Sequence, residues 1–229
     1  LVRTDMQGRV IQQQVTDIEA VNYGYDTRGR LISLTQGRGT AARTTSFNYN
    51  AEGYLESVTD PTGRMQSYKY DAAGRIKYQT LSDDRIIKYS YDANGNVISL
   101  IPPESSSHTF TYTPVNLESQ YTPPAARQPT PQTQYSYNLD KQLTLITRPD
   151  GQLVELDYDT GGRLRMLTNP MGEVRYTYEE ATSGNFSTIE NRGTLLSYTY
   201  DGALPLIETL SGSIAGKVSR SYNNDFKLS

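Results

Sequence analysis

The stretch from Tyr68 to Ile76, Tyr-Lys-Tyr-Asp-Ala-Ala-Gly-Arg-Ile, decides the fold of this chain. Tyr68 and Tyr70 are two positions apart, so in a β-strand their side chains project from the same face. Asp71 and Gly74 then hold the first and fourth places of a type I turn. There aspartate accepts hydrogen bonds from downstream N–H groups, and glycine tolerates the positive φ of a bulged hairpin. Because Ile76 begins a returning strand, the stretch predicts one β-hairpin.

The same pattern recurs along nearly the whole chain. The clearest further copies are Tyr23–Leu31 and Tyr89–Val97. Looser copies keep most of the pattern, and those that begin at Tyr176 and Tyr198 keep the tyrosine pair but lose the glycine. The second tyrosines of the pairs recur every 20 to 25 residues, at Tyr25, Tyr49, Tyr70, Tyr91, Tyr112, Tyr137, Tyr158, Tyr178, Tyr200 and Tyr222. Self-similarity at such a period is typical of repeat architectures. We therefore expect residues 1–229 to form a single repeat region with no separate domain.

A second kind of turn joins one hairpin to the next. Asp60–Gly63, Arg148–Gly151 and Asn169–Gly172 each place proline at the second turn position, where its fixed φ favours a reversal. Two strands per repeat predict about twenty short strands, and so large a sheet must curve or spiral. The predicted fold class is all-β, an antiparallel meander of β-hairpins in a curved or spiralling sheet.

Apolar residues depart from strict alternation at one place in the repeat. Leu31 and Leu34 are both apolar, as are Leu143 and Ile146, although residues three apart in a regular strand face opposite sides. Either a β-bulge or two partly buried faces would explain this spacing. The sequence alone leaves both explanations open.

Tyrosine supplies much of the surface that this chain can bury. The chain has 19 tyrosines, no cysteine, and a formal net charge of −3. Each tyrosine buries on the order of 150–250 Å², so we expect tyrosine ladders to form much of the core, with hydroxyls at sheet edges or on a wetted face. The lack of cysteine excludes disulfides and thiolate metal sites. No apolar run approaches the length of a membrane span.

Two stretches break the regular pattern. Residues 101–133 hold seven of the eleven prolines around a degenerate Phe110-Thr111-Tyr112 pair, and proline removes donors from a strand ladder. We expect one weak repeat flanked by extended loops there, with a docking segment or a junction between two sheet blocks as the alternative. Residues 179–191 are predicted to be a second irregular loop. Incomplete repeats at both ends favour a fragment of a longer polypeptide.

Few residues offer catalytic or metal-binding chemistry. His108 is the only histidine, and no nucleophile elbow surrounds it, so we interpret it as a solvated loop residue. Turn capping explains the repeated aspartates better than paired carboxylates or calcium ligands, and the run from Asp92 lacks the glycine and glutamate positions of an EF-hand. Net negative charge argues against nucleic acid as a partner of the Gly-Arg steps, whose arginines we expect to be solvated or ion-paired. We expect no enzyme activity, cofactor or metal.

We interpret the repeated residues as a structural motif. Its members are Tyr23, Tyr25, Asp26, Gly29, Tyr49, Gly53, Tyr68, Tyr70, Asp71, Gly74, Tyr89, Tyr91, Asp92, Gly95, Tyr135, Tyr137, Tyr158, Asp159, Gly162, Tyr176, Tyr178, Tyr198, Tyr200 and Asp201. No catalytic, cofactor-binding or metal-binding role is expected of them.

The recurring Tyr-Asp steps resemble those of the Rhs/YD-repeat family. They occur at Tyr25-Asp26, Tyr70-Asp71, Tyr91-Asp92, Tyr158-Asp159 and Tyr200-Asp201. That family includes bacterial Rhs polymorphic toxins, C subunits of insecticidal toxin complexes, wall-associated proteins and teneurins. The resemblance implies a spiral sheet that forms a hollow shell, which in the toxins encloses a C-terminal effector of the same polypeptide. In the family, an Asp-Pro-x-Gly-Leu motif ends the shell and carries self-cleavage. The most similar stretch of this chain, Asp60–Gly63, is followed by Arg64 in place of leucine, so we do not expect self-cleavage there.

Two hypotheses about function follow. The first is a non-enzymatic structural segment of the shell of a secreted bacterial toxin. The second is a cell-surface adhesion module whose tyrosine rows and proline-rich loops bind a glycan or a protein. The expected partners are the remaining repeats and an effector domain of the same polypeptide, with self-association through strand edges as a further expectation. A secreted or cell-surface location in a bacterium follows from the resemblance alone.

Overall fold

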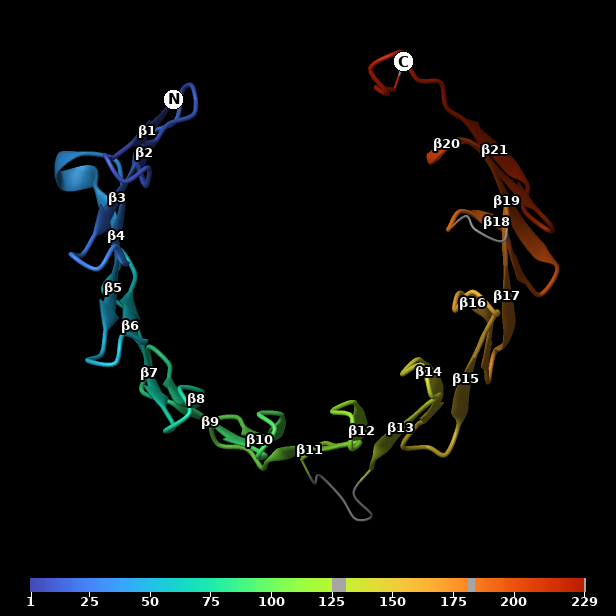
Figure 1. The fold of residues 1–229 in the computed structure, drawn as a ribbon, viewed down its shortest axis with the longest axis horizontal. Coiled ribbons are helices and arrows are strands. Elements are labelled where there is room, and N and C mark those ends of the chain that lie inside the picture. The colour runs from blue at the N-terminus through green and yellow to red at the C-terminus, as the bar shows by residue number, and fades with distance from the viewer. Residues whose placement is uncertain (125–130, 181–183, 229) are drawn as a thin grey trace. The chain divides into compact units, whose positions relative to one another are not determined.

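Strands form nearly all the regular structure of the chain (Figure 1). The computed structural model describes residues 1–124, 131–180 and 184–228. It contains 21 strands of one antiparallel sheet and one short 3₁₀ helix, η1 (Gly39–Ala41). The predicted all-β, antiparallel class is confirmed. No helix in these three ranges has the length and apolar character needed to cross a membrane.

The chain divides into two compact units, Leu1–Thr109 and Phe110–Ser229. The first unit contains β1 (Val2–Thr4), β2 (Val10–Gln13), β3 (Val21–Tyr25), β4 (Leu31–Gln36), β5 (Arg43–Tyr49), β6 (Leu55–Thr59), β7 (Met65–Tyr70), β8 (Ile76–Thr80), β9 (Ile86–Tyr91) and β10 (Val97–Ile101). β11 (His108–Tyr112) contains the boundary. The second unit contains β12 (Glu118–Thr122), β13 (Thr133–Tyr137), β14 (Leu143–Thr147), β15 (Leu153–Tyr158), β16 (Leu164–Asn169), β17 (Gly172–Tyr178), β18 (Phe186–Asn191), β19 (Thr194–Asp201), β20 (Leu204–Ser211) and β21 (Gly216–Ser219).

Within each unit, every strand pairs with the strands that precede and follow it in sequence. The pairings run from β1–β2 to β9–β10 in the first unit. They run from β12–β13 to β20–β21 in the second. This is the meander of hairpins that the repeat predicts.

The turns that follow the second tyrosines have the geometry that their sequence predicts. At Asp71 the N–H of Gly74 donates to the Asp71 carbonyl at 3.0 Å, and the N–H of Asp71 donates to the Arg75 carbonyl at 2.9 Å. Gly74 has a φ of +78°. The same pair of backbone bonds recurs at Asp26, Asn50, Asp92 and Asp159. Positive φ values are likewise found at Gly29, Gly53, Gly95 and Gly162. A type I turn with a glycine bulge therefore closes each of these hairpins.

A β-bulge explains why Leu31 and Leu34 are both apolar. Leu34 lies opposite Tyr23 and Leu31 opposite Tyr25, with the register shifted between the two pairs. Opposed residues of an antiparallel pair share a face, so all four side chains lie on one face, which we term the tyrosine face. The same shift in β13–β14 places Ile146 opposite Tyr135 and Leu143 opposite Tyr137.

Of the two stretches predicted to be irregular, the second contains more strand than expected. Residues 101–133 include β11 and β12, which fit the one weak repeat that was predicted there, and residues 125–130 of this stretch lie outside the described residues. The predicted loop 179–191 is wrong over its second half, because Phe186–Asn191 forms β18 between β17 and β19. Phe186 and Ile189 are strong strand formers, and each neighbouring strand offers β18 an open row of backbone groups.

The sheet has almost no fully buried side chains. Among the described residues, only Ala20 and Ser57 are buried, with 4% and 7% of their surface exposed. The motif tyrosines are half-buried rather than enclosed in a core. Stability must therefore come chiefly from contacts between successive hairpins, as in other repeat proteins.

Candidate functional site

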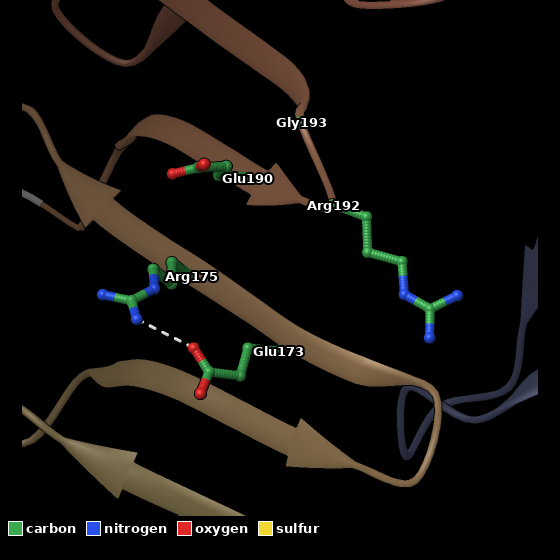
Figure 2. A pocket seen from close by; sticks show the side chains of 5 residues that line it. All are labelled: Glu173, Arg175, Glu190, Arg192 and Gly193. Carbon is green, nitrogen blue, oxygen red and sulfur yellow. Dashed lines mark hydrogen bonds and ion pairs between the residues drawn. The ribbon is translucent and has the colours of Figure 1, made fainter.

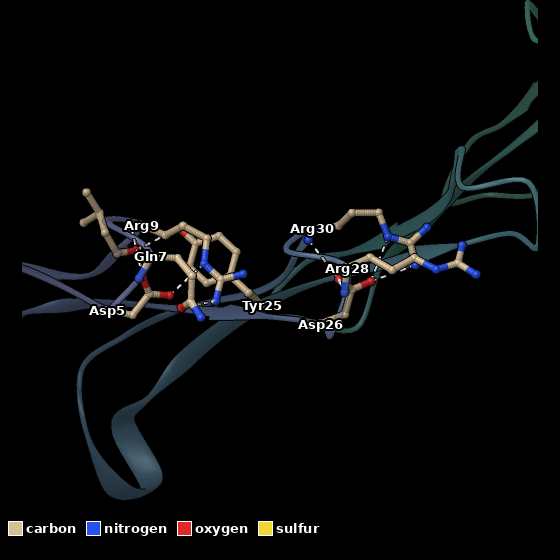
Figure 3. A network of polar contacts seen from close by, with 8 residues as sticks. Asp5, Gln7, Arg9, Tyr25, Asp26, Arg28 and Arg30 are labelled. Atoms are coloured by element: carbon tan, nitrogen blue, oxygen red, sulfur yellow. Dashed lines mark hydrogen bonds and ion pairs between the residues drawn. The ribbon is translucent and has the colours of Figure 1, made fainter.

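Four of the turns hold an ion pair between an aspartate at the first position and an arginine at the fifth. Asp26 Oδ1 accepts the backbone N–H groups of Arg28 and Arg30, both at 2.9 Å, and Asp26 Oδ2 accepts the Nε–H of Arg30 at 2.7 Å (Figure 3). The arginine contacts recur at Asp5–Arg9, Asp71–Arg75 and Asp159–Arg163. The aspartates thus cap these turns, as predicted, and they also fix the orientation of each guanidinium.

The fixed arginine of one repeat lies over the second tyrosine of the next. The guanidinium carbon of Arg30 is 4.4 Å from the ring centroid of Tyr49, and that of Arg75 is 4.5 Å from Tyr91. The same contact joins Arg9 to Tyr25 at 4.7 Å (Figure 3) and Arg163 to Tyr178 at 4.3 Å. A cation this close to an aromatic face is attracted by the ring quadrupole. We term this recurring set of contacts the Asp–Arg–Tyr ladder.

The hydroxyl of the second tyrosine donates a hydrogen bond to the backbone of the preceding hairpin. Tyr91 donates to the Ile76 carbonyl at 2.7 Å, and Tyr49 donates to the Leu31 carbonyl at 2.8 Å. In both cases the acceptor is the first residue of the preceding returning strand. Equivalent bonds join Tyr25 to Val10, Tyr70 to Leu55, Tyr137 to Glu118, Tyr158 to Leu143 and Tyr178 to Leu164. These hydroxyls therefore bind backbone carbonyls between repeats, which the sequence did not predict.

Other side chains make the inter-repeat link where the repeat lacks arginine. Tyr54 takes the place of the arginine and stacks on Tyr70, with ring centroids 4.9 Å apart. Gln142 accepts a bond from Asn138 in its own turn and donates to the Gly162 carbonyl of the next turn at 2.7 Å. The position after the turn thus joins successive hairpins through more than one kind of contact.

Gly74→Ala is expected to destabilise the protein more than Gly63→Ala. Both glycines have left-handed φ values, +78° and +84°, so each substitution should cost about 1–2 kcal/mol in backbone strain. A Cβ at Gly74 would also clash with the hydroxyl of Tyr54 and displace the ring from Tyr70, whereas nothing lies within 4 Å at Gly63. Urea unfolding of the two variants measures the difference, and equal losses would contradict the stacking role of Tyr54.

The turn contacts lower the pKa values of the aspartates. The side chain of Arg75 and then its backbone N–H hold the pKa of Asp71 below the ordinary value of 3.8. At Asp159 the backbone N–H of Arg163 has the larger effect on the pKa, followed by the arginine side chain. A carboxylate with a lower pKa in the folded state binds protons more tightly when unfolded, so protonation favours unfolding.

The free energy of unfolding is therefore expected to be steady above about pH 5 and to fall as the pH drops below the ordinary aspartate pKa toward the lowered folded-state values. Urea midpoints measured from pH 7 to pH 2 check this. Asp71→Asn provides the control, because Asn50 accepts the N–H of Tyr54 at 2.8 Å and shows that asparagine can cap such a turn. The variant should lose stability at neutral pH and depend less steeply on pH below 4. An unchanged slope would contradict a role for this carboxylate.

Not every motif residue joins the ladder. The first tyrosines make longer contacts, such as that from the Tyr89 hydroxyl to Gln79 at 3.4 Å. Tyr198 and Tyr200 stack on each other instead, at 6.1 Å between centroids. Asp201 ends β19 opposite Leu204, and no capping bond of its carboxylate is found among the described residues. Turn capping is therefore a wrong prediction for Asp201, because the two strands stay paired up to a two-residue turn.

His108 lies in a strand and not in the predicted loop. It pairs with Leu100 of β10, because the strand that carries Phe110 and Tyr112 extends back to include it. No group of three His, Asp or Glu side chains able to hold a metal is found within the described ranges.

One shallow groove lies on the hairpin of β17 and β18 (Figure 2). It is lined by Glu173, Arg175, Glu190, Arg192 and Gly193. Arg175 forms an ion pair with Glu173 at 2.8 Å, and Glu190 lies across from Arg175 on the neighbouring strand. Charges of both signs thus neutralise one another on this surface, which favours a solvated sheet face over a reaction centre.

Comparison with known proteins adds a family and a fold. The family model described as Teneurin YD-shell matches residues 2–229. No curated protein sequence matches the chain. The crystal structure of TcdB2-TccC3-Cdc42 aligns with 98% of this chain at a TM-score of 0.65 and 16% identity. The crystal structure of TcdB2-TccC3 without its hypervariable C-terminal region aligns with 98% of it at 0.65 and 14%. The Photorhabdus luminescens Tc holotoxin pore aligns with 92% of it at 0.55 and 16%.

These similarities show that the chain shares its fold with part of much larger proteins. This chain spans 16% of the length of the first two matched chains and 15% of the third.

Proposed function

This chain belongs to the teneurin YD-shell family, and from that premise we propose that it is a structural segment of the shell of a secreted bacterial toxin of the YD-repeat type. In this proposal the ribbon of hairpins curves, together with further repeats of the same polypeptide, into a casing around a C-terminal effector. The segment performs no catalysis. Its role is to form a rigid part of the casing.

The Asp–Arg–Tyr ladder is the observation that supports this role most strongly. A sheet with two side chains buried among the described residues has no interior to make it rigid. At four places an arginine held by its own turn and a tyrosine held by a backbone carbonyl connect one hairpin to the next, as Arg75 and Tyr91 do. Links of this kind between successive hairpins resist bending within each unit, and resistance to bending is the property that a casing needs and an enzyme does not.

Protease protection in the full-length parent polypeptide tests the proposal. The segment downstream of the repeats should stay intact at a protease concentration that digests the same segment expressed alone. Combining Arg30→Ala, Arg75→Ala and Arg163→Ala should make the enclosed segment accessible, whereas Arg85→Ala, which breaks an exposed ion pair to Asp83, should not. Equal digestion rates for the enclosed and isolated segments would refute enclosure.

Glycan-array binding by the same full-length polypeptide distinguishes the shell from the alternative, the adhesion module. Binding to a glycan array that is lost when first tyrosines such as Tyr23 and Tyr89 are replaced by alanine would favour adhesion. We expect no such binding, because the half-buried tyrosines of this face pack against neighbouring hairpins.

A further inference from the structure

The turn that begins at Asp60 has the same aspartate–arginine contacts as the four ladder turns. It lies at the start of β7, whereas the ladder turn at Asp71 lies at the end of β7. Asp60 Oδ1 accepts the backbone N–H groups of Thr62 and Arg64 at 2.8 and 3.0 Å, and Asp60 Oδ2 accepts the Arg64 Nε–H at 2.7 Å. The guanidinium of Arg64 is thus oriented by the same contacts that orient Arg30 and Arg75.

The guanidinium of Arg64 differs from those in the ladder in having no ring over it among the described residues. Its side chain is 70% exposed, against 27% for Arg30 and 32% for Arg75, whose faces are covered by tyrosines. Holding a long side chain in one geometry costs conformational entropy. In the ladder that fixed geometry serves to receive a tyrosine ring.

Arg64 also lines a groove that has room for such a ring. The groove has a volume of about 350 Å³ and is bordered by Val58, Asp60, Gln66, Tyr68 and Ser82. Val58 and Gln66 face each other across β6 and β7, and they form an apolar and a polar wall. Ser82 adds a hydroxyl from the turn between β8 and β9.

We propose that this groove docks a tyrosine side chain presented by a partner protein segment, with the phenol ring over the guanidinium of Arg64. The four ladder contacts, at 4.3 to 4.7 Å, show that this chain pairs an aspartate-held arginine with a tyrosine ring. Asp60 neutralises the charge of Arg64, so the site attracts a simple anion weakly, while the planar face stays available for stacking. The inference does not depend on the shell, because Arg64 lies outside the ladder.

The test is an NMR titration of the whole chain with ¹⁵N-labelled arginine, in which the Nε–Hε signal of Arg64 is followed. N-acetyl-L-tyrosinamide is the probe, and N-acetyl-L-leucinamide, sodium acetate and galactose are the comparisons. The tyrosine amide should shift the Arg64 signal upfield with saturation, and the other three should not. Arg64→Lys, which keeps the charge but removes the planar face, should weaken binding by about two- to thirtyfold.

The matched control is Arg148→Ala, which removes an ion-paired arginine from the corresponding turn between β14 and β15 and should leave binding unchanged. Three results would overturn the proposal. The first is the absence of a saturable shift with the tyrosine amide. The second is an equal shift with the leucine amide, acetate or galactose, and the third is retention of full tyrosine-amide affinity by Arg64→Lys. Thermal unfolding of each variant confirms that the chain remains folded, as expected for a side chain this exposed.

Discussion

Replacing Tyr91 by alanine is expected to lower the free energy of unfolding by about 2–4 kcal/mol, somewhat less than the loss of a fully buried aromatic ring. The substitution removes three contacts at once. These are the ring surface packed on the tyrosine face, the contact with Arg75, and the hydroxyl bond to the Ile76 carbonyl at 2.7 Å. Because burial also raises the pKa of Tyr91, its hydroxyl stays protonated and able to donate at neutral pH.

Phenylalanine at the same position separates the hydroxyl from the ring. Tyr91→Phe keeps the ring over Arg75 and should cost about 0.5–1.5 kcal/mol for the lost hydrogen bond. Tyr89→Phe is the matched control on the same strand and should cost less, because its hydroxyl is 3.4 Å from Gln79. Urea unfolding checks all three variants. A Tyr91→Phe loss no larger than that of Tyr89→Phe would contradict the bond to the preceding hairpin.

Replacing Arg75 by alanine should cost about 1–3 kcal/mol, from the stack on Tyr91 and the hydrogen bond to a carbonyl. That bond runs from Arg75 Nη1 to the Asp92 carbonyl of the next turn, at 3.1 Å. Arg75→Lys should recover little of the loss, because an ammonium lacks the planar face and the forked donors.

Arg64→Ala is the control for the arginine series. It removes an ion pair of the same geometry to Asp60, and no tyrosine is stacked on this arginine among the residues that the structure describes. A surface substitution of this kind usually changes stability by less than about 0.5 kcal/mol. Similar losses for Arg64→Ala and Arg75→Ala would show that the ion pair in the turn matters, and not the contact between repeats.

The sequence predicts the local structure well because one repeat contains the residues that determine it. The type I turn is predictable because Asp71 supplies the capping carboxylate and Gly74, three residues later, supplies the positive φ. The spacing of Leu31 and Leu34 left a choice between a bulge and two buried faces. Only the register settles that choice, by placing each leucine opposite a tyrosine.

The contacts between repeats could not be predicted in the same way. Arg75 and Tyr91 belong to different hairpins, so their meeting depends on strand register and on how neighbouring hairpins lie together. The signal was present in the sequence as a Gly-Arg step at a fixed place in several repeats. That step predicts a solvated or ion-paired arginine, which is correct for the turn but omits the tyrosine. Likewise, β18 and the strand position of His108 depend on neighbouring strands that offer open backbone groups.

A double-mutant cycle between Arg75 and Tyr91 tests most directly whether the ladder joins successive hairpins. The free energy of unfolding is measured for the parent chain, Arg75→Ala, Tyr91→Ala and the double variant. We expect the double variant to lose less than the sum of the two single losses, by about 0.5–2 kcal/mol, because the contact can be lost only once. Losses that add to within about 0.3 kcal/mol would contradict the ladder.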